Sequence, residues 1–190
     1  MSSSNQIFYQ LPVQKLLAIT AYGEAATEGI EGLSGVLNVI GNRTKYPDQF
    51  SDQSILVTTG NIYHAVILKP YQFSVFNNTN PGRARMERFA QNFDLAYRNE
   101  EVLRTAYDLA GKLLSGLLPD NTHGATFYHA TSVLPSWASE IPVIGQIGNH
   151  IFYGYQQIME IASNPINWAW IIAGGIFLLL LIRGKRDAIT

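Results

Sequence analysis

One carboxylate in this chain stands out because almost all of its neighbours are apolar. Glu24 lies in the segment 16–26, which otherwise contains only Leu, Ala, Ile, Thr, Tyr and Gly. Burial disfavours the charged form of an acid and raises its pKa above the usual value of about 4.3. A carboxyl group of this kind can donate a proton near neutral pH, so we expect Glu24 to act as a general acid.

Three later segments combine aromatic rings with hydrogen-bonding groups, at residues 71–74, 125–129 and 147–153. We expect them to surround the acid and to bind its ligand through amide, hydroxyl and imidazole groups. The candidate binding residues are Tyr71, Gln72, Ser74, Tyr128, His129, His150 and Tyr153. Three other aromatic residues of these segments, Phe73, Phe127 and Phe152, are expected in the core, and so is Trp137.

The composition excludes several classes of site. The chain has 190 residues and no cysteine, so it can form neither a disulfide nor a thiolate metal site. Its net charge of −1 argues against bulk binding of nucleic acid, which requires clustered Lys and Arg. No pair among its four histidines has the i, i+4 spacing of a helical zinc site. We therefore expect no metal and no cofactor.

The most apolar run of the chain lies near its C-terminus, at residues 166–182. As a helix this run would be roughly 25 Å long, near the lower limit for crossing a bilayer. Trp168 and Trp170 lie at one end, where an interfacial belt is expected, and Arg183 and Lys185 follow the other end. We expect a transmembrane helix at 166–182 and a basic tail at 183–190; a buried core helix is the alternative.

The N-terminal tail, residues 1–11, lacks the basic start and the long apolar stretch of a secretory signal. A basic C-terminal tail favours the cytoplasmic side, yet a long N-terminal domain does not readily cross a membrane without a leader. The orientation of the expected anchor is therefore left open.

Between these ends we expect one domain over residues 12–160, with a hinge at 161–165 around Asn164–Pro165. Apolar spacing predicts helices at 12–26 and 33–43, a short helix through Val57 capped by Ser51 or Asp52, and one further helix through 86–97. It also predicts a helix from 100 to 117, capped by Asn99, whose inner face carries Val102, Ala106, Leu109, Leu113 and Leu117. Gly29 and Gly32 are expected to break the first helix. Strands are expected at 72–76, 126–130 and 150–153. This pattern predicts an α+β fold, mostly helical with a small sheet.

Several segments in order resemble those of the SleB-type cell wall hydrolases, the spore-cortex-lytic enzymes and their phage relatives. The segments are Tyr22-Gly23-Glu24-Ala25, Glu31-Gly32, the run 36–43 ending Gly41-Asn42-Arg43, then 71–74, 124–130, Pro135-Ser136-Trp137 and 147–153. The resemblance covers about residues 18–154. It implies a lysozyme-like fold that acts on the glycan strands of peptidoglycan, with Glu24 as the essential acid.

The number of carboxylates at the site separates two reaction types. Hydrolysis through a nucleophile or an activated water needs a second carboxylate, and Glu31 is a better candidate than Glu28 because it matches the family's Glu-Gly. A single acid suits lytic transglycosylation, the activity known in the resembled family. There, one glutamate protonates the bond between N-acetylmuramic acid and N-acetylglucosamine, and a 1,6-anhydro ring closes without water.

These expectations combine into a membrane-anchored lytic transglycosylase. An anchored lytic domain without an export signal suits a bacteriophage with an internal membrane, which would use the enzyme for wall penetration or lysis. Its expected partners are peptidoglycan and the lipid membrane, with capsid proteins and the genome near Arg183, Lys185 and Arg186, and without specific nucleic-acid recognition. The alternatives are a hydrolytic muramidase of the same fold, an inactive peptidoglycan-binding virion protein, and a host enzyme of the bacterial membrane.

Overall fold

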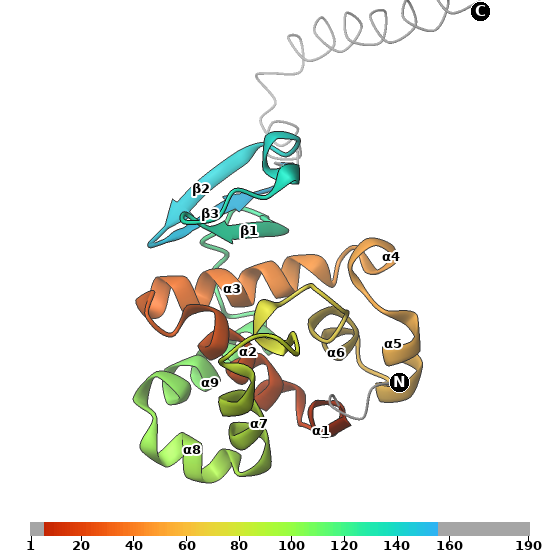
Figure 1. Ribbon diagram of the computed structural model, residues 1–190, viewed down its shortest axis with the longest axis vertical. Coiled ribbons are helices and arrows are strands. Elements are labelled where there is room, and N and C mark those ends of the chain that lie inside the picture. Colours follow the sequence, from red (N-terminus) through yellow and green to blue (C-terminus); the bar gives the residue numbers. More distant parts are fainter. Residues whose placement is uncertain (1–5, 156–190) are drawn as a thin grey trace, which may run out of the picture. The chain divides into compact units, whose positions relative to one another are not determined.

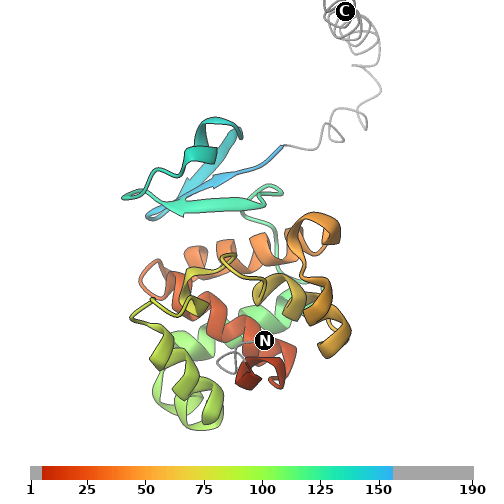
Figure 2. The same cartoon turned by 45° about the vertical axis from the view of Figure 1, so that its right-hand side comes forward.

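The computed structural model describes residues 6–155. Its helices form one part, the helical lobe, and its strands form a second part, the sheet lobe, which lies against α3 (Figures 1 and 2). The elements are α1 (Gln6–Tyr9), α2 (Val13–Ala25), α3 (Gly29–Arg43), α4 (Pro47–Phe50), α5 (Gln53–Thr59), α6 (Ile62–Ile67), η2 (Ser74–Phe76), α7 (Arg83–Gln91), α8 (Phe93–Asn99), α9 (Glu101–Leu114), β1 (Phe127–Ala130), η3 (Ser136–Ser139), β2 (Val143–Ile147) and β3 (His150–Tyr153).

Helix α2 occupies the centre of the helical lobe. Six consecutive residues, 16–21, are completely buried, and the helix packs against α3, α6, α7 and α9. A helix that is apolar almost all round must be covered on every side, so the predicted first helix is confirmed. Pro12 precedes this helix at the N-cap position rather than lying inside it.

Helix α3 begins earlier than its apolar spacing predicts. Gly29 starts it with a φ of 68°, and Gly32 lies inside it, so only the first of these glycines separates the two helices. A Cβ at Gly32 would overlap the side chain of Glu28, which explains why a glycine stands there. Further along, α5 starts after Asp52, whose carboxylate accepts hydrogen bonds from Ser54 N and Ile55 N, so Asp52 and not Ser51 is the N-cap.

The single helix expected through 86–97 is wrong: two helices, α7 and α8, occupy this region. They are separated at Asn92, which has a non-helical backbone and accepts a hydrogen bond from Leu95 N. The N-cap of α9 is Glu100 and not Asn99, which still belongs to α8. Leu117 lies beyond α9 and is 72% exposed, so its expected place on the inner face is also wrong.

The strand expected at 72–76 is wrong as well. Phe73 and Val75 are buried and Ser74 is exposed, an alternation that resembles a half-buried strand. The chain instead tightens into the 3-10 turn η2, and Val75 N–H donates to the carboxylate of Glu24 rather than to a neighbouring strand.

The sheet has three antiparallel strands in the order β1-β3-β2. Phe127 pairs with Tyr153 and Ala130 pairs with His150, which confirms the two strands expected at 126–130 and 150–153. The sequence reading missed β2, none of whose residues is fully buried and whose pairing is irregular at Gly145. The predicted mostly helical α+β domain with a small sheet is confirmed.

No helix within residues 6–155 is long and apolar enough to cross a bilayer. The expected hinge at 161–165, transmembrane helix at 166–182 and tail at 183–190 lie outside the described residues, as do residues 1–5 of the expected N-terminal tail.

Candidate active site

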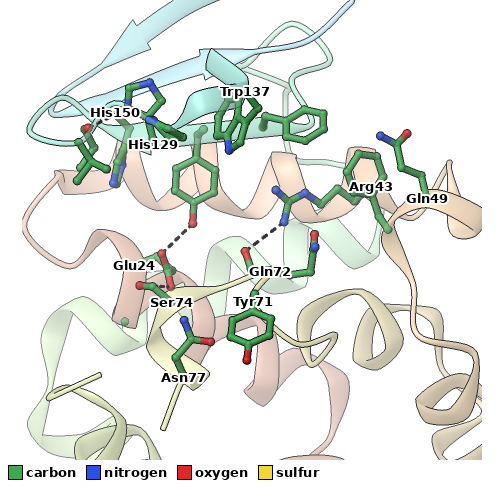
Figure 3. Close-up of a pocket in the computed structure, with 17 residues that line it drawn as sticks. Glu24, Arg43, Gln49, Tyr71, Gln72, Ser74, Asn77, His129, Trp137 and His150 are labelled. Carbon is green, nitrogen blue, oxygen red and sulfur yellow. Dashed lines mark hydrogen bonds between the residues drawn. The ribbon is translucent and has the colours of Figure 1, made fainter. Parts of the chain in front are cut away.

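A groove of about 730 Å³ runs between the helical lobe and the sheet lobe (Figure 3). The sheet lobe supplies one rim through β1 and the loop that follows it. The helical lobe supplies the other through the end of α2, α4 and the segment 71–77. The lining residues are Gly23, Glu24, Arg43, Gln49, Phe50, Tyr71, Gln72, Ser74, Asn77, Phe127, Tyr128, His129, Ala130, Val133, Pro135, Trp137 and His150.

Glu24 connects the two rims of this groove (Figure 3). Its Oε2 accepts a hydrogen bond of 2.9 Å from the hydroxyl of Tyr128 on β1. Its Oε1 accepts from Val75 N at 2.9 Å and from Ser74 Oγ at 3.1 Å. The carboxylate is half-buried, and its immediate partners are three donors rather than the purely apolar surroundings expected from its neighbours in sequence.

Gly23 makes this arrangement possible. A Cβ at this position would overlap the Val75 side chain and would lie 3.1 Å from Met86 Sδ. Because residue 23 has no side chain, η2 can approach α2 closely enough for Val75 N–H to reach Glu24. The glycine therefore positions the backbone donor of the site.

Tyr128 is held as a hydroxyl donor. Its ring stacks on Phe152 at 5.8 Å and meets the edge of His150 at 5.1 Å. Burial, followed by the nearby charge of Glu24, raises the pKa of Tyr128 well above its ordinary value. The phenol therefore stays protonated across the physiological range and can donate to Glu24 throughout.

Arg43 ends the run Gly41-Asn42-Arg43, and the sequence alone does not predict it as a site residue. It is only 5% exposed, and burial lowers its pKa to about 10, which still leaves it charged at neutral pH. Its Nε donates to Thr126 O at 2.7 Å, and Nη1 donates to Gln72 O at 3.4 Å. This cation at the end of α3 thus ties the start of β1 to the opposite rim of the groove.

The two histidines of the groove differ in their hydrogen bonds. His129 uses both ring nitrogens, Nδ1 with Ala130 O at 2.9 Å and Nε2 with the Tyr153 hydroxyl at 2.7 Å. His150 is 7% exposed, and its Nδ1 has no hydrogen-bond partner among the described residues. Burial lowers the pKa of His150, so its imidazole is neutral at neutral pH.

The other two acids near Glu24 in the sequence do not reach the groove. Glu28 accepts hydrogen bonds from the backbone and side chain of Asn149, at 2.8 and 3.2 Å. Glu31 accepts from Asn121 Nδ2 at 3.0 Å and does not line the groove. Among residues 6–155, Glu24 is the one carboxylate that lines the groove.

Residues 27–153 match the family described as Cell Wall Hydrolase. The chain belongs to this family. Its members act on peptidoglycan, so we expect catalysis to take place in the groove that Glu24 lines. The matched range starts three residues after Glu24, so the role of this side chain depends on the geometry of the groove.

Two solved structures are similar to this cell wall hydrolase. The catalytic domain of the Bacillus cereus SleB protein is 23% identical, with a TM-score of 0.50, and the match covers 75% of this chain and 89% of that one. A catalytic domain described as that of the germination-specific lytic transglycosylase SleB from Bacillus anthracis is 21% identical, with a TM-score of 0.49 over 81% of this chain and 97% of that one. The first likeness shows that the fold is shared. A search of the curated proteins found no match.

Most of the predicted site residues of this cell wall hydrolase come together at the groove. Glu24 and the predicted binding residues of 71–74, β1 and β3 line it, except Tyr153, which is buried behind His129. Gln72 and Ser74 belong to a turn and η2 rather than to a strand. Glu31, the candidate second carboxylate, is not brought to Glu24.

Sequence reasoning also missed several lining residues. Phe73 and Phe152 are core residues as expected, but Phe127 and Trp137 line the groove. Gln49 and Asn77 were not considered, because each lies in a polar stretch with no local pattern that marks it. Only the tertiary fold brings them to the rim.

Proposed function

We propose that this chain is a lytic transglycosylase with Glu24 as its single general acid and base, acting at the bond between N-acetylmuramic acid and N-acetylglucosamine. The observation that carries the proposal is that Glu24 is the one carboxylate lining the groove within residues 6–155. Both forms of two-carboxylate hydrolysis need a second acid, at about 5 Å or at roughly 6.5 to 9.5 Å. We propose in addition that the domain has a lysozyme-like fold and that the glycan strand binds in this groove.

In this mechanism Glu24 donates its proton to the glycosidic oxygen, and the bond from that oxygen to C1 of the muramic acid breaks. The acetamido group of the same sugar stabilises the cationic centre. The ionised Glu24 then takes the proton of the C6 hydroxyl while the C6 oxygen bonds to C1 and closes the 1,6-anhydro ring. The acid form is restored and no water is consumed.

The hydrogen bonds of Glu24 indicate which oxygen carries the proton. Val75 N–H can only donate, and it donates to Oε1. Oε1 therefore serves as a permanent acceptor, and the transferable proton belongs on Oε2. The hydroxyl of Tyr128, which donates to Oε2 when the carboxylate is ionised, can rotate to accept when it is protonated.

The test is mass spectrometry of muropeptides released from purified peptidoglycan by the full-length chain. We expect anhydro products, which are one water lighter than hydrolytic ones. Glu24→Gln should lower the rate by at least about 100-fold. Glu31→Gln is the matched control and should retain the rate, since that side chain lies outside the groove. Hydrolytic products would establish a muramidase instead, and binding without release in every variant would establish an inactive peptidoglycan-binding protein.

We also propose that residues 166–182 anchor the enzyme in a bilayer, in the internal membrane of a virion. This is supported by the apolar run, the two tryptophans near its start and the basic residues after it. Flotation of the full chain with lipid vesicles tests the anchor: Ile176→Arg should abolish flotation and Ile176→Leu should keep it.

In purified virions we expect the catalytic domain on the outer side of the membrane and the tail on the genome side. A tail digested by protease in intact membrane vesicles would contradict that orientation, and recovery from uninfected bacterial membranes would favour a host enzyme.

A further inference from the structure

The loop before η2 contains a tyrosine in a backbone conformation that favours glycine. Gln72 N donates to Lys69 O at 3.2 Å, which closes a four-residue turn with Pro70 and Tyr71 in the middle. Tyr71 has a φ of 64°. Proline followed by a residue of positive φ is the type II turn, whose third position is normally glycine or asparagine.

Other contacts hold this turn in place on both sides of the tyrosine. Lys69 Nζ donates to Gln49 O at 2.7 Å, and Arg43 Nη1 donates to Gln72 O. Phe73, the next residue, is 2% exposed in the core. Tyr71 therefore cannot relax to a negative φ without breaking these contacts.

Burial of the tyrosine side chain does not offset the free-energy cost of this backbone conformation. Tyr71 is 88% exposed, and the described residues include no hydrogen bond or ring contact of its side chain. The left-handed conformation of a residue with a Cβ weakens the folding equilibrium by a factor of about 5 to 30. Such conformations persist mainly where they serve a ligand site.

Tyr71 lies on the helical-lobe rim of the groove, and Trp137 lies on the sheet-lobe rim (Figure 3). The two rings differ in their surroundings. Trp137 packs against Phe127, His129 and Tyr153 at 5.3 to 5.7 Å, whereas Tyr71 is 88% exposed at the rim and its ring contacts no other ring among residues 6–155. Tyr71 is three residues before Ser74, so its Cα lies within about 10 Å along the chain of a residue that touches Glu24.

We propose that Tyr71 is a stacking platform for a pyranose ring next to the bond that is cleaved, held ready by the strained turn. This inference rests on the proposed function, because the ligand is then a glycan strand. A flat aromatic ring suits the apolar C–H face of a sugar and tolerates variation in its hydroxyl groups. The contact lies away from the reacting atoms, so its loss should weaken binding and leave the chemical step almost unchanged.

The experiment measures affinity and stability in the full chain carrying Glu24→Gln, with purified peptidoglycan glycan strands as the probe. Tyr71→Asn should lower the affinity about five- to tenfold, the size of one aromatic contact. It should leave the thermal midpoint equal to or above that of the parent, because asparagine tolerates a positive φ. Tyr71→Phe should keep the affinity within about twofold, since the ring is retained.

His123 provides a matched control. It is the second non-glycine residue of positive φ within residues 6–155, with a φ of 54°, and it is exposed and outside the groove. His123→Asn should leave the affinity unchanged. Unchanged affinity in Tyr71→Asn would overturn the inference, and so would a loss of affinity accompanied by a lower thermal midpoint, which would mark a structural role. Hydrolytic products from the intact enzyme would refute only the proposed chemistry, since this assay measures binding alone.

Discussion

The two lobes that form the groove are stabilised in different ways. The helical lobe surrounds α2 with one large apolar cluster drawn from all of its longer helices. The sheet lobe has a much smaller cluster around Val39, Ala125 and Phe152. Its other attachments are a ring contact between Phe127 and Phe50 and several polar contacts, among them Arg43 to Thr126 O, Asn149 to Glu28 and Asn42 to Asp120. One rim of the groove is thus held by extensive burial and the other by a small apolar cluster and a few directional contacts.

This difference indicates which substitutions should disturb the geometry of the active site. Hydrophobic burial is spread over many side chains, so the acid-bearing helix keeps its place when one surface contact is lost. A hydrogen bond to a buried carbonyl depends on one donor, and a substitution that removes this donor leaves the carbonyl unpaired. We therefore expect substitutions in the helical core to act on the whole domain and substitutions of the polar contacts to act first on the sheet.

The largest expected effect is in the helical core. Leu17 is completely buried in α2, so Leu17→Ala should lower the free energy of unfolding by about 2–5 kcal/mol. Hydrogen exchange followed by mass spectrometry should show faster exchange in α2 and in the sheet together, because the whole domain unfolds more often. Faster exchange confined to one lobe would contradict the shared core.

Arg43→Gln should have a somewhat smaller but more local effect. It removes the bond to Thr126 O and a buried charge that lies over the rings of Phe50 and Phe73. We expect a loss of about 1–3 kcal/mol, with exchange accelerated in β1 and β3 before α2. Arg43→Lys is the control for charge. It should recover little, because a lysine cannot donate to both carbonyls from the same position.

Gly23→Ala should damage activity more than stability. The added methyl group would push Val75 away and lengthen or break its bond to Glu24. We expect the rate on peptidoglycan to fall by about tenfold or more, as follows from misplacing a group at the reaction centre by a fraction of an ångström. Gly60→Ala has no close neighbour and should leave the rate unchanged, although it is strained by a φ of 64°. Equal rates in Gly23→Ala and the parent would show that the backbone donor is dispensable.

The contrast between the lobes also explains how far the sequence could be read. Apolar spacing predicted α2, most of α3 and the inner face of α9 as far as Leu113, because those residues are buried or partly buried where the spacing places them. It could not predict η2, where a hydrogen bond to a residue 51 positions away decides the backbone. It also missed β2, which has no fully buried residue and an irregular pairing at Gly145, so its side chains do not alternate regularly. The assembly of the groove depends on such distant contacts.

The same limit applied to the site residues. Glu24, Gln72, Ser74 and Tyr128 were recognisable from residue type and from the family resemblance. Arg43 was not, because a positively charged side chain at the end of a helix usually faces solvent, and only the tertiary fold shows it buried. Glu31 attracted attention through the same resemblance, yet the direction of α3 carries it away from Glu24.

The smallest expected effect is on the acid stability of the sheet lobe. Hydrogen bonds from Asn149 lower the pKa of Glu28. Burial alone would raise the pKa of Asp120, but bonds from Thr122, Asn42 and Gly124 N outweigh it and lower the pKa. A carboxylate whose pKa is lower in the folded state stabilises the fold at neutral pH. That contribution is lost as the pH falls through the folded-state pKa.

Acidification should therefore loosen the sheet before the helical lobe. We expect hydrogen exchange, corrected for its intrinsic pH dependence, to rise first in β1 and in the turn that carries Asn149. In Asp120→Asn this early rise should be smaller between neutral and acid pH, because the variant has already lost the charge that titrates. Asp94→Asn is the control: its carboxylate is exposed and, among residues 6–155, forms its ion pair with Lys15, so the pH profile of the sheet should not change. An acid-induced opening that begins in α2 would show that apolar burial, and not the polar contacts, limits the stability of the groove.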